Sequence, residues 1–412
     1  MTVAAFMDLA LYDPQFGYYA RAPRRSGHAG DFFTSVDVGA LFGELVEVQI
    51  AEMFSILAGD GSRPLDLVEA GAGSGQLSAD ILRAAHTRDP LLYSRTALHL
   101  VEASATARAA QRTVLGEDAA RLASSGPELP ESFTGVLIAN ELLDALPVHQ
   151  IVMRENGLRE LYVHANGNVG LTLREGPLST PALADYLERL NVTLEPGWRV
   201  EINLEACDWI QSAARRLTRG FIILIDYGHE ARELYSVTHA SGTLTSFSRH
   251  TAGVEPSDGP PPWLNRPGEQ DITAHVDFTS VRMAAEQAGL TTLGMLDQTY
   301  FLLGLADLGS LGSLGSLGSL GSLGSLGSLG SPGSPGSPGS PGSPGSLSSK
   351  SANPENRENP ENPEKLGHLK KRLALKTLLL PGGLGSTMKV LIFSKGVGNP
   401  ALRGCSYRMR VT

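Results

Sequence analysis

The sequence predicts an α/β fold in which helices alternate with the buried strands of an open sheet. A short apolar run at 65–68 is followed by a glycine-rich turn and then by apolar residues at helical spacing over 76–85. Two more apolar runs, at 136–139 and 221–225, end abruptly in polar residues. Because ligands of open α/β sheets bind at the carboxyl ends of the strands, we expect the functional site where these runs end.

The glycine-rich turn that follows Glu69 predicts a cofactor site. Gly71, Gly73 and Gly75 let backbone N–H groups approach a ligand, and the N-terminus of the next helix favours anionic groups. The dinucleotide fingerprint G-x-G-x-x-G requires a glycine where Gln76 stands. An acidic residue before three alternating glycines is instead similar to motif I of class I S-adenosylmethionine (SAM) methyltransferases. A glycine-rich turn without a ligand stays open as the alternative.

Composition limits the class of protein. The 412 residues are 42% hydrophobic and 19% charged, which allows a substantial core in one large domain with insertions or in two domains. The formal net charge of −9 argues against a general nucleic-acid binder and is compatible with a basic protein or peptide substrate. No apolar run reaches the ~18 residues that would predict a membrane span.

Cysteine usage and the first residues predict the compartment. Cys207 and Cys405 are far apart and form neither a disulfide framework nor zinc-ligand spacing, so we expect a reducing compartment and no metal site. The segment 1–6 shows no signal-peptide or transit-peptide pattern. Together these features predict a cytoplasmic protein.

Acidic residues follow two of the predicted strands. Glu102 follows the strand at 97–101, where a carboxylate suits the two hydroxyls of a ribose. The alternative for Glu102 is a solvated residue at the rim of the sheet. Asp226 follows the run at 221–225 in the same way.

A second polar group, Asn140, Glu141 and Asp144, follows the strand at 136–139. If 141–146 forms one helical turn, the two carboxylates are three residues apart and share a face. They would then line the pocket at the edge of the sheet. In the alternative, Asn140 caps the turn and Asp144 is solvated.

Residues 149–176 alternate between apolar and polar, with turn signals at 155–157 and 166–168. This pattern predicts a small antiparallel sheet inserted into the α/β domain, which serves as a substrate or partner surface or as a structural flap. The segment 118–132 contains Ser-Gly-Pro and a second proline, and is predicted to be a loop.

Low-complexity sequence interrupts the last part of the chain. Leu-Gly-Ser is repeated eight times over 308–331, and Pro-Gly-Ser five times over 332–346. Such a tract cannot bury enough surface to offset the entropy of ordering it, so we expect disorder. The expected organisation is a helical cap or lid (1–60), the first half of the cofactor-binding core (61–148), the inserted hairpins (149–200), the second half of the core (201–307), the low-complexity insert (308–364), and a helix with a closing strand (365–412).

Several motifs in order give the chain a resemblance to a known family, the MidA/NDUFAF7 (DUF185) family of class I SAM-dependent methyltransferases. The motifs are Leu11–Pro14 with Phe16–Tyr19, Gly30–Ser35, Glu69–Gly75, Asn140–Val148, Asp226–Gly228, Gly242–Leu244 and Asp271–Phe278. The resemblance implies a Rossmann-like, seven-stranded methyltransferase sheet, which 388–396 would close as an antiparallel strand. It also implies protein arginine methylation, with assembly of respiratory complex I as the role of the mitochondrial members.

The resemblance also implies roles for individual residues. Catalysis would consist mostly of positioning. An arginine acceptor needs a carboxylate pair to orient it and to receive its proton; Glu141 and Asp144 are the first candidates. The expected SAM-binding residues are Asp31, Thr34, Glu69, Gly71, Gly73, Gly75 and Glu102, and the further catalytic candidates are Asn140, Asp226 and His275.

Two other functions compete with this interpretation. One is a nucleotide-dependent oxidoreductase, which Gln76 disfavours. The other is an assembly factor that keeps a SAM pocket without turnover. As partner we expect an arginine-bearing protein, with a respiratory complex subunit as one such protein. The sequence leaves the oligomeric state open.

Deletion of the insert provides a first test. Because the entropy of closing a loop grows only with the logarithm of its length, removing 308–364 should leave the binding of S-adenosylhomocysteine unchanged. Calorimetric titration of the full chain and the deletion variant measures this. Loss of binding on deletion would show that the tract is not an inert loop.

Overall fold

The computed structural model describes residues 1–21, 34–58, 64–167, 170–248, 251–252, 259–306, 374, 377–378 and 388–407. The chain divides into two units, Met1–Leu305 with Ala374–Thr412, and Ala306–Leu373. The account below concerns the first unit. Asp31, the low-complexity insert and most of the helix expected over 365–378 lie outside the described residues.

A large, mostly parallel sheet forms the centre of the first unit. Its strand order is β14-β15-β9-β4-β1-β2-β3, and the short strand β13 extends it beside β9. β15 is antiparallel to both β9 and β14, which confirms the predicted closing strand. The strands are β1 Leu65–Ala70, β2 Thr96–Val101, β3 Leu122–Gly126, β4 Phe133–Asn140, β9 Leu217–His229, β13 Val276–Asp277, β14 Thr291–Asp297 and β15 Met388–Lys395.

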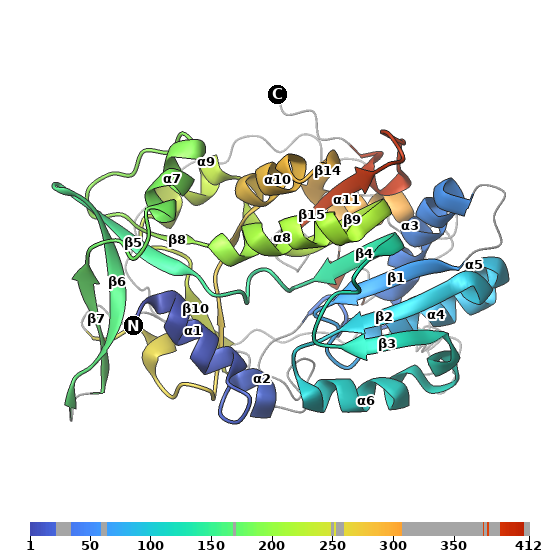
Figure 1. Ribbon diagram of the computed structural model, residues 1–412, viewed down its shortest axis with the longest axis horizontal. Helices are drawn as coiled ribbons and strands as arrows, with labels where there is room; N and C mark the ends of the chain where they lie inside the picture. Colours follow the sequence, from blue (N-terminus) through green and yellow to red (C-terminus); the bar gives the residue numbers. More distant parts are fainter. Residues whose placement is uncertain are drawn as a thin grey trace, which may run out of the picture. The chain divides into compact units, whose positions relative to one another are not determined.

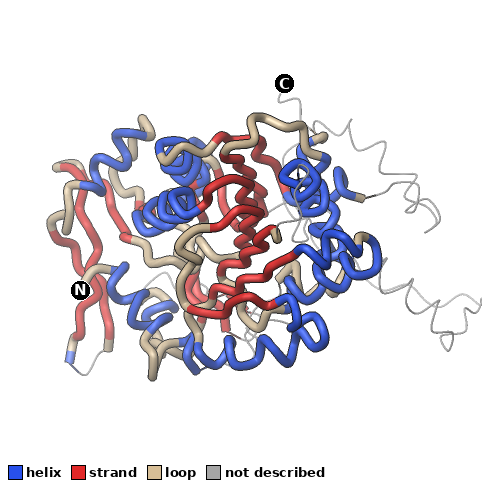
Figure 2. The backbone as a smooth tube through the Cα atoms, turned by 45° about the vertical axis from the view of Figure 1, so that its right-hand side comes forward, coloured by secondary structure: helices blue, strands red, loops and turns tan. Residues whose placement is uncertain are grey.

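Helices cover both faces of this sheet (Figures 1 and 2). Apolar residues of α8 and α10 pack on one face, in one cluster with Leu137, Ile222 and Leu391. The strands β9 and β15 read as continuous apolar runs because their residues are buried on both faces. The helices of this layer and its surroundings are α3 Leu41–Ala58, α4 Gln76–Arg88, α5 Pro90–Arg95, α6 Ala105–Leu115, α8 Leu204–Arg216, α9 Ala231–Leu234, α10 Phe278–Gln287 and α11 Gln298–Leu305, with the 3₁₀ turns η1 Gly116–Arg121, η3 Val237–His239, η4 Pro262–Leu264 and η7 Arg403–Cys405.

The loop predicted over 118–132 is wrong in its first part. Residues 116–121 form η1, and Leu122–Gly126 form strand β3, which pairs in parallel with β2. β3 is the edge strand, and its three central residues are exposed. A strand with one neighbour and little burial needs no apolar run, so the sequence carries no strand signal there.

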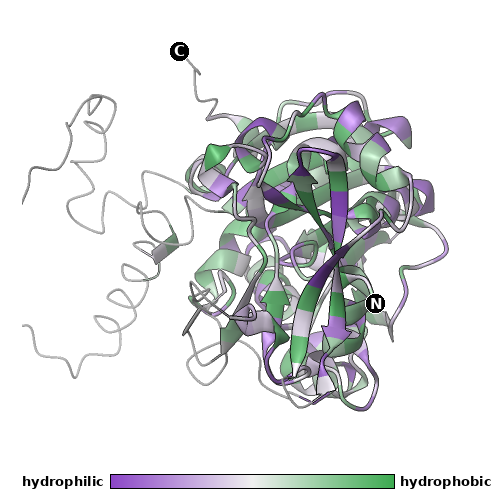
Figure 3. Cartoon of the chain, turned by 90° about the vertical axis from the view of Figure 1, so that its left-hand side faces the viewer, coloured by the Kyte–Doolittle hydropathy of each residue, from purple (hydrophilic) through white to green (hydrophobic). Residues whose placement is uncertain are grey.

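The predicted small antiparallel sheet is confirmed. Its order is β7-β6-β5-β8, and the turn at Glu155 and Asn156 joins β5 to β6 as expected. Figure 3 shows hydrophilic and hydrophobic residues alternating in this part of the molecule, as in a sheet with one face buried. The elements are β5 His149–Arg154, β6 Gly157–Ala165, β7 Leu171–Gly176, α7 Ala182–Arg189 and β8 Arg199–Ile202.

The N-terminal helices belong to two different parts of the fold. α1 (Val3–Tyr12) and α2 (Tyr18–Arg21) share an apolar cluster with β5 and β6 of the small sheet, whereas α3 packs against α4. The side chain of Tyr18 is 2% exposed and belongs to this cluster. A third sheet, β11-β10-β12, consists of Thr251–Ala252, Thr245–Ser248 and Asp271–Thr273.

None of the helices in the described part of the chain is both long enough and apolar enough to cross a membrane.

Candidate active site

The parallel register brings the predicted site residues to one edge of the central sheet. Ala70 at the end of β1 pairs with Val101 on one side and with Ala139 on the other, and Asn140 pairs with Ile225. The residues that follow these strand ends therefore stand in a row. They are Gly71, Glu102 and Glu141. Asp226, which was expected after its strand, lies within β9 instead, next to Ile225.

The glycine turn after β1 is shaped by left-handed backbone. Gly71, Gly73 and Gly75 have φ values of 71°, 52° and 82°, which favour glycine. A Cβ on Gly71 would lie 3.1 Å from the Leu142 side chain, so the turn packs directly on the segment after β4. A Cβ on Gly73 would have no heavy atom within 4 Å. Gly73 thus borders open space, where a ligand can approach the backbone.

Glu102 lies beside this turn and is only 7% exposed. Its carboxylate accepts hydrogen bonds from the backbone N–H groups of Gly73 (2.8 Å) and Ser104 (2.7 Å). The solvated-rim alternative is therefore wrong.

The sequence analysis missed another residue that holds the turn, Gln111 of α6. It donates to the carbonyl of Gly73 (2.9 Å) and accepts from the hydroxyl of Ser125 (2.6 Å). It is fully buried. A single glutamine on an amphipathic helix carries no sequence signal for such a contact.

Glu69 fastens the turn from the other side. Its buried carboxylate accepts hydrogen bonds from the backbone N–H (3.1 Å) and the hydroxyl of Ser78 in the first turns of α4. Burial raises the pKa of Glu69 to about 7, although these hydrogen bonds act in the opposite direction. The carboxylate thus joins β1 to α4 and fixes the glycine turn between them. Its expected contact with the cofactor stays a prediction.

The helical turn expected over 141–146 does not form. Glu141 has a φ of 54°, which is left-handed and rare for a residue with a side chain. The segment is instead held by Asp226 of β9. Its carboxylate accepts hydrogen bonds from the backbone N–H groups of Leu142 (3.1 Å), Leu143 (2.7 Å) and Tyr227 (2.8 Å). These bonds give Asp226 a positioning role; catalysis by it stays a prediction.

The buried Asp144 and Asp226 and the half-buried Glu141 form a cluster of carboxyl groups, called the carboxyl cluster below. Burial, and then the charge of Asp226, raises the pKa of Glu141 to about 8. Burial and the charges of Asp226 and Glu141 raise the pKa of Asp144 well above its usual range. Burial raises the pKa of Asp226 to about 7. Asp144 is only 8% exposed, so the alternative of a solvated Asp144 is wrong.

Asn140 does not cap a helix but faces Glu141. Its amide nitrogen donates to Glu141 Oε1 (3.2 Å), and within the described part of the chain its buried Oδ1 has no hydrogen-bond partner. A buried carbonyl oxygen without a donor indicates a ligand at this point. The helix cap, which was the alternative for Asn140, is therefore wrong, and its place in a ligand pocket stays a prediction.

The segment that begins at Thr34 contacts the carboxyl cluster through Ser35. The backbone N–H of Ser35 donates to Glu141 Oε1 (3.4 Å), and its hydroxyl donates to Gln298 (3.1 Å). Thr34 donates to the carboxylate of Asp37 through both its N–H and its hydroxyl, which closes a local turn. Ser35 and Gln298 were not among the predicted residues. Asp31, the other residue expected at the methionine end of SAM, lies outside the described residues.

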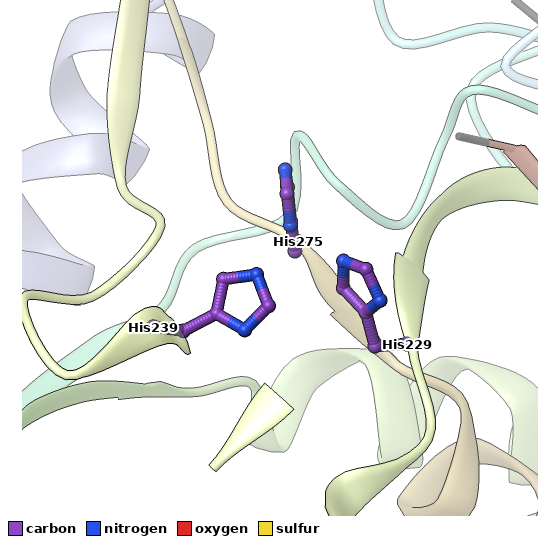
Figure 4. A group of neighbouring side chains, drawn as sticks. All are labelled: His229, His239 and His275. Carbon is purple, nitrogen blue, oxygen red and sulfur yellow. The ribbon is translucent and has the colours of Figure 1, made fainter. Parts of the chain in front are cut away.

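His275 groups with two other histidines. Its ring centroid lies 5.2 Å from that of His229 and 5.9 Å from that of His239 (Figure 4). Burial lowers the pKa of His275 to about 4. The backbone next to His275 reaches the carboxyl cluster, because the N–H of Ala274 donates to the carbonyl of Asp144 (3.0 Å). A catalytic role for His275 stays a prediction.

Comparison with known proteins identifies the family. A family model described as "Putative S-adenosyl-L-methionine-dependent methyltransferase" matches residues 45–296. The chain belongs to this methyltransferase family. It is therefore a SAM-dependent methyltransferase, and SAM is its cofactor. The alternative of a nucleotide-dependent oxidoreductase is rejected.

Relatives and solved structures of this methyltransferase family agree with the assignment. The mouse protein named "Protein arginine methyltransferase NDUFAF7, mitochondrial" is 31% identical over 329 residues, covering 73% of this chain and 70% of the mouse protein. The zebrafish protein of the same name is 31% identical over 327 residues, covering 73% and 72%. The crystal structure of a COG1565 superfamily member from Burkholderia thailandensis bound to S-adenosyl-homocysteine superposes with a TM-score of 0.77 at 25% identity, covering 98% of this chain and 90% of that one.

The residues at the sheet edge of this methyltransferase fit SAM. The open side of Gly73 leaves room for the ligand at the backbone, and the carboxylate of Glu102 lies next to it. The unpartnered oxygen of Asn140 offers a hydrogen-bond acceptor at the end of the neighbouring strand. When bound, SAM supplies an electrophilic methyl group. The chain's own residues hold the cofactor and position the acceptor.

A pair of glycine substitutions tests the cofactor cradle. Gly73→Ala should lower the affinity for S-adenosylhomocysteine at least about tenfold, because the new methyl group occupies the open side of the turn. The matched control is Gly116→Ala, since Gly116 at the end of α6 also has a positive φ (57°) and free space around a Cβ. Both variants carry a backbone cost of about 1–2 kcal/mol. Calorimetric titration should show lost affinity in the first alone; equal affinities would contradict the cradle.

The raised pKa of Glu141 predicts a pH-dependent stability. The folded state binds a proton that the unfolded state releases near pH 4.3, so stability falls as pH rises from about 4.3 to about 8. Glu141→Gln removes this dependence. The difference between the unfolding temperature of this variant and that of the parent chain should therefore increase from pH 5 to pH 8. Thermal unfolding across this range measures the effect, with the exposed Glu195→Gln as control. A constant difference would contradict the buried, protonated state.

Proposed function

We propose that this methyltransferase transfers the methyl group to the guanidinium group of an arginine in a partner protein. The observation that carries the proposal is the carboxyl cluster at the same edge as the glycine turn. In the part of the chain that the structure describes, these three acidic groups have raised pKa values and form no ion pair with a cation. A guanidinium group supplies a delocalised positive charge and several N–H donors to carboxylate oxygens.

The chemistry of the acceptor needs such a cluster. A guanidinium nitrogen is a poor nucleophile because the group stays protonated above pH 12. Carboxylates orient it by charge-assisted hydrogen bonds, and one of them receives the proton that leaves the nitrogen when its new N–C bond forms. Glu141 and Asp144 are assigned these roles. Asp226 holds their segment, because its hydrogen bonds go to Leu142 and Leu143.

The names of the relatives support this substrate class. The mouse and zebrafish relatives are named protein arginine methyltransferases. A protein substrate also suits the small antiparallel sheet β7-β6-β5-β8, which follows the segment after β4 in the chain. A subunit of a respiratory complex is the first partner to test. The cytoplasmic location expected from the sequence stays a prediction.

Methyl-labelled SAM provides the test. A bacterial lysate is incubated with the chain and SAM carrying a deuterated methyl group, and fragment mass spectrometry locates the label. We expect labelled arginine in one or a few proteins. Glu141→Gln should reduce the labelling at least about 100-fold, because removing a positioned base costs about 10²–10⁴ in rate. Glu195→Gln, at an exposed site, should leave it unchanged.

The alternatives give different results in the same experiment. Label on lysine or on a small molecule would contradict the arginine acceptor and keep the methyltransferase. Absence of label from a chain that binds S-adenosylhomocysteine would favour an assembly factor without turnover.

A further inference from the structure

Three histidines from distant parts of the sequence meet beside the end of strand β9. His229 is the last residue of β9, His239 ends η3, and His275 directly precedes β13. The pairing of β13 with β9, which sets Asp277 opposite His229, brings the first and last of these segments together. One ring nitrogen of each histidine lies within 4.8 Å of those of the other two, and Figure 4 shows the three rings facing a common point.

The surroundings of the rings match those of metal-binding histidines. Such a histidine commonly places its second nitrogen against a carboxylate or a backbone carbonyl, which fixes the ring. Glu233 provides both: its carboxylate lies 3.0 Å from His229 Nδ1, and its carbonyl oxygen lies 3.0 Å from His239 Nδ1. The first contact is close but not aligned as a hydrogen bond. The Nε2 atoms of both rings are thus left for a ligand.

The third ring offers an unused nitrogen. His275 Nδ1 is buried, and in the part of the chain that the structure describes it has no hydrogen-bond partner. A buried nitrogen without a partner costs free energy unless a ligand satisfies it.

We propose that His229, His239 and His275 form a site for a divalent transition metal ion, with zinc as the expected ion. Imidazole ligands favour zinc and its neighbours over magnesium or calcium, which prefer oxygen. A tetrahedral zinc ion with Zn–N bonds of about 2.0 Å holds its ligand nitrogens about 3.3 Å apart, so binding rotates the rings toward one another. Three protein ligands leave the fourth position to water.

The site would tie the segment between β9 and β10 to the edge of the central sheet. His239 lies in that segment, whereas His229 and His275 lie on paired strands. The residue before His275 donates its N–H to the carbonyl of Asp144, so the bound ion would also steady the backbone next to the carboxyl cluster. The proposal does not depend on the arginine acceptor. The sequence analysis expected no metal because the two cysteines lack zinc-ligand spacing, and it did not consider these histidines as a group.

Metal titration of the whole chain tests the site. The untagged protein is stripped with a chelator and titrated with Zn²⁺ alone, and in parallel with Co²⁺, whose visible absorption reports a tetrahedral nitrogen site. We expect one equivalent of Zn²⁺ per chain at micromolar free metal, displacing Co²⁺. His239→Asn should weaken binding at least 100-fold. Glu233→Gln should weaken it about 10- to 100-fold, because such outer partners contribute that much.

The control is His164→Asn, because His164 on β6 is exposed and outside the group. It should bind Zn²⁺ like the parent chain. Every preparation is also titrated with S-adenosylhomocysteine, which shows that the fold and the cofactor site are intact and separates this proposal from the proposed function. A parent chain that binds S-adenosylhomocysteine but less than 0.1 equivalent of Zn²⁺ would overturn the proposal. Unchanged zinc binding by His239→Asn would overturn it equally.

Discussion

The buried carboxylate of Asp226 is the interaction on which the site depends. Asp226 lies in β9, and its carboxylate accepts backbone hydrogen bonds from Leu142 and Leu143, which follow the neighbouring strand β4. Without this acceptor the segment after β4 would have unpaired N–H groups in a buried place, at a cost of about 1–3 kcal/mol each. The same bonds hold Glu141 in a left-handed conformation at the edge of the sheet.

This arrangement couples the two halves of the reaction. Leu142, fixed by Asp226, packs against Gly71, so the acceptor side and the cofactor turn share one contact. Glu102 and Gln111 hold the turn at Gly73 from the opposite direction. Under the proposed function, the backbone of the glycine turn would bind the cofactor and the carboxyl cluster would bind the acceptor, side by side at one edge of the parallel sheet. Mutual repulsion in the carboxyl cluster is the cost of that arrangement, and a cationic acceptor relieves it.

The sequence predicted the parts of the fold that follow from apolar runs and glycine. The strands after which Gly71 and Asn140 stand, and the closing strand β15, were expected because their burial leaves a plain pattern. The edge strand β3 was missed because exposed residues such as Ala123 to Ser125 carry no such pattern.

The residues of the site likewise divide into those that the sequence predicted and those that it missed. Glu102, Glu141 and Asp144 were predicted from their places after strands, and they lie at one edge. The helical turn expected for Glu141 and Asp144 was wrong, because a long-range acceptor from β9 decided the conformation. Gln111, Ser35, Gln298 and the grouping of three histidines depend on contacts between distant segments, which spacing in one sequence does not record.

A crystal structure of the S-adenosylhomocysteine complex soaked in millimolar guanidinium ion is the most direct test of the central claim. The account predicts S-adenosylhomocysteine along the glycine turn at Gly73 and a planar guanidinium ion on the carboxylates of Glu141 and Asp144. S-adenosylhomocysteine bound at the turn with no cation on those carboxyl groups, at a pH above 8 where Glu141 is ionised, would contradict it.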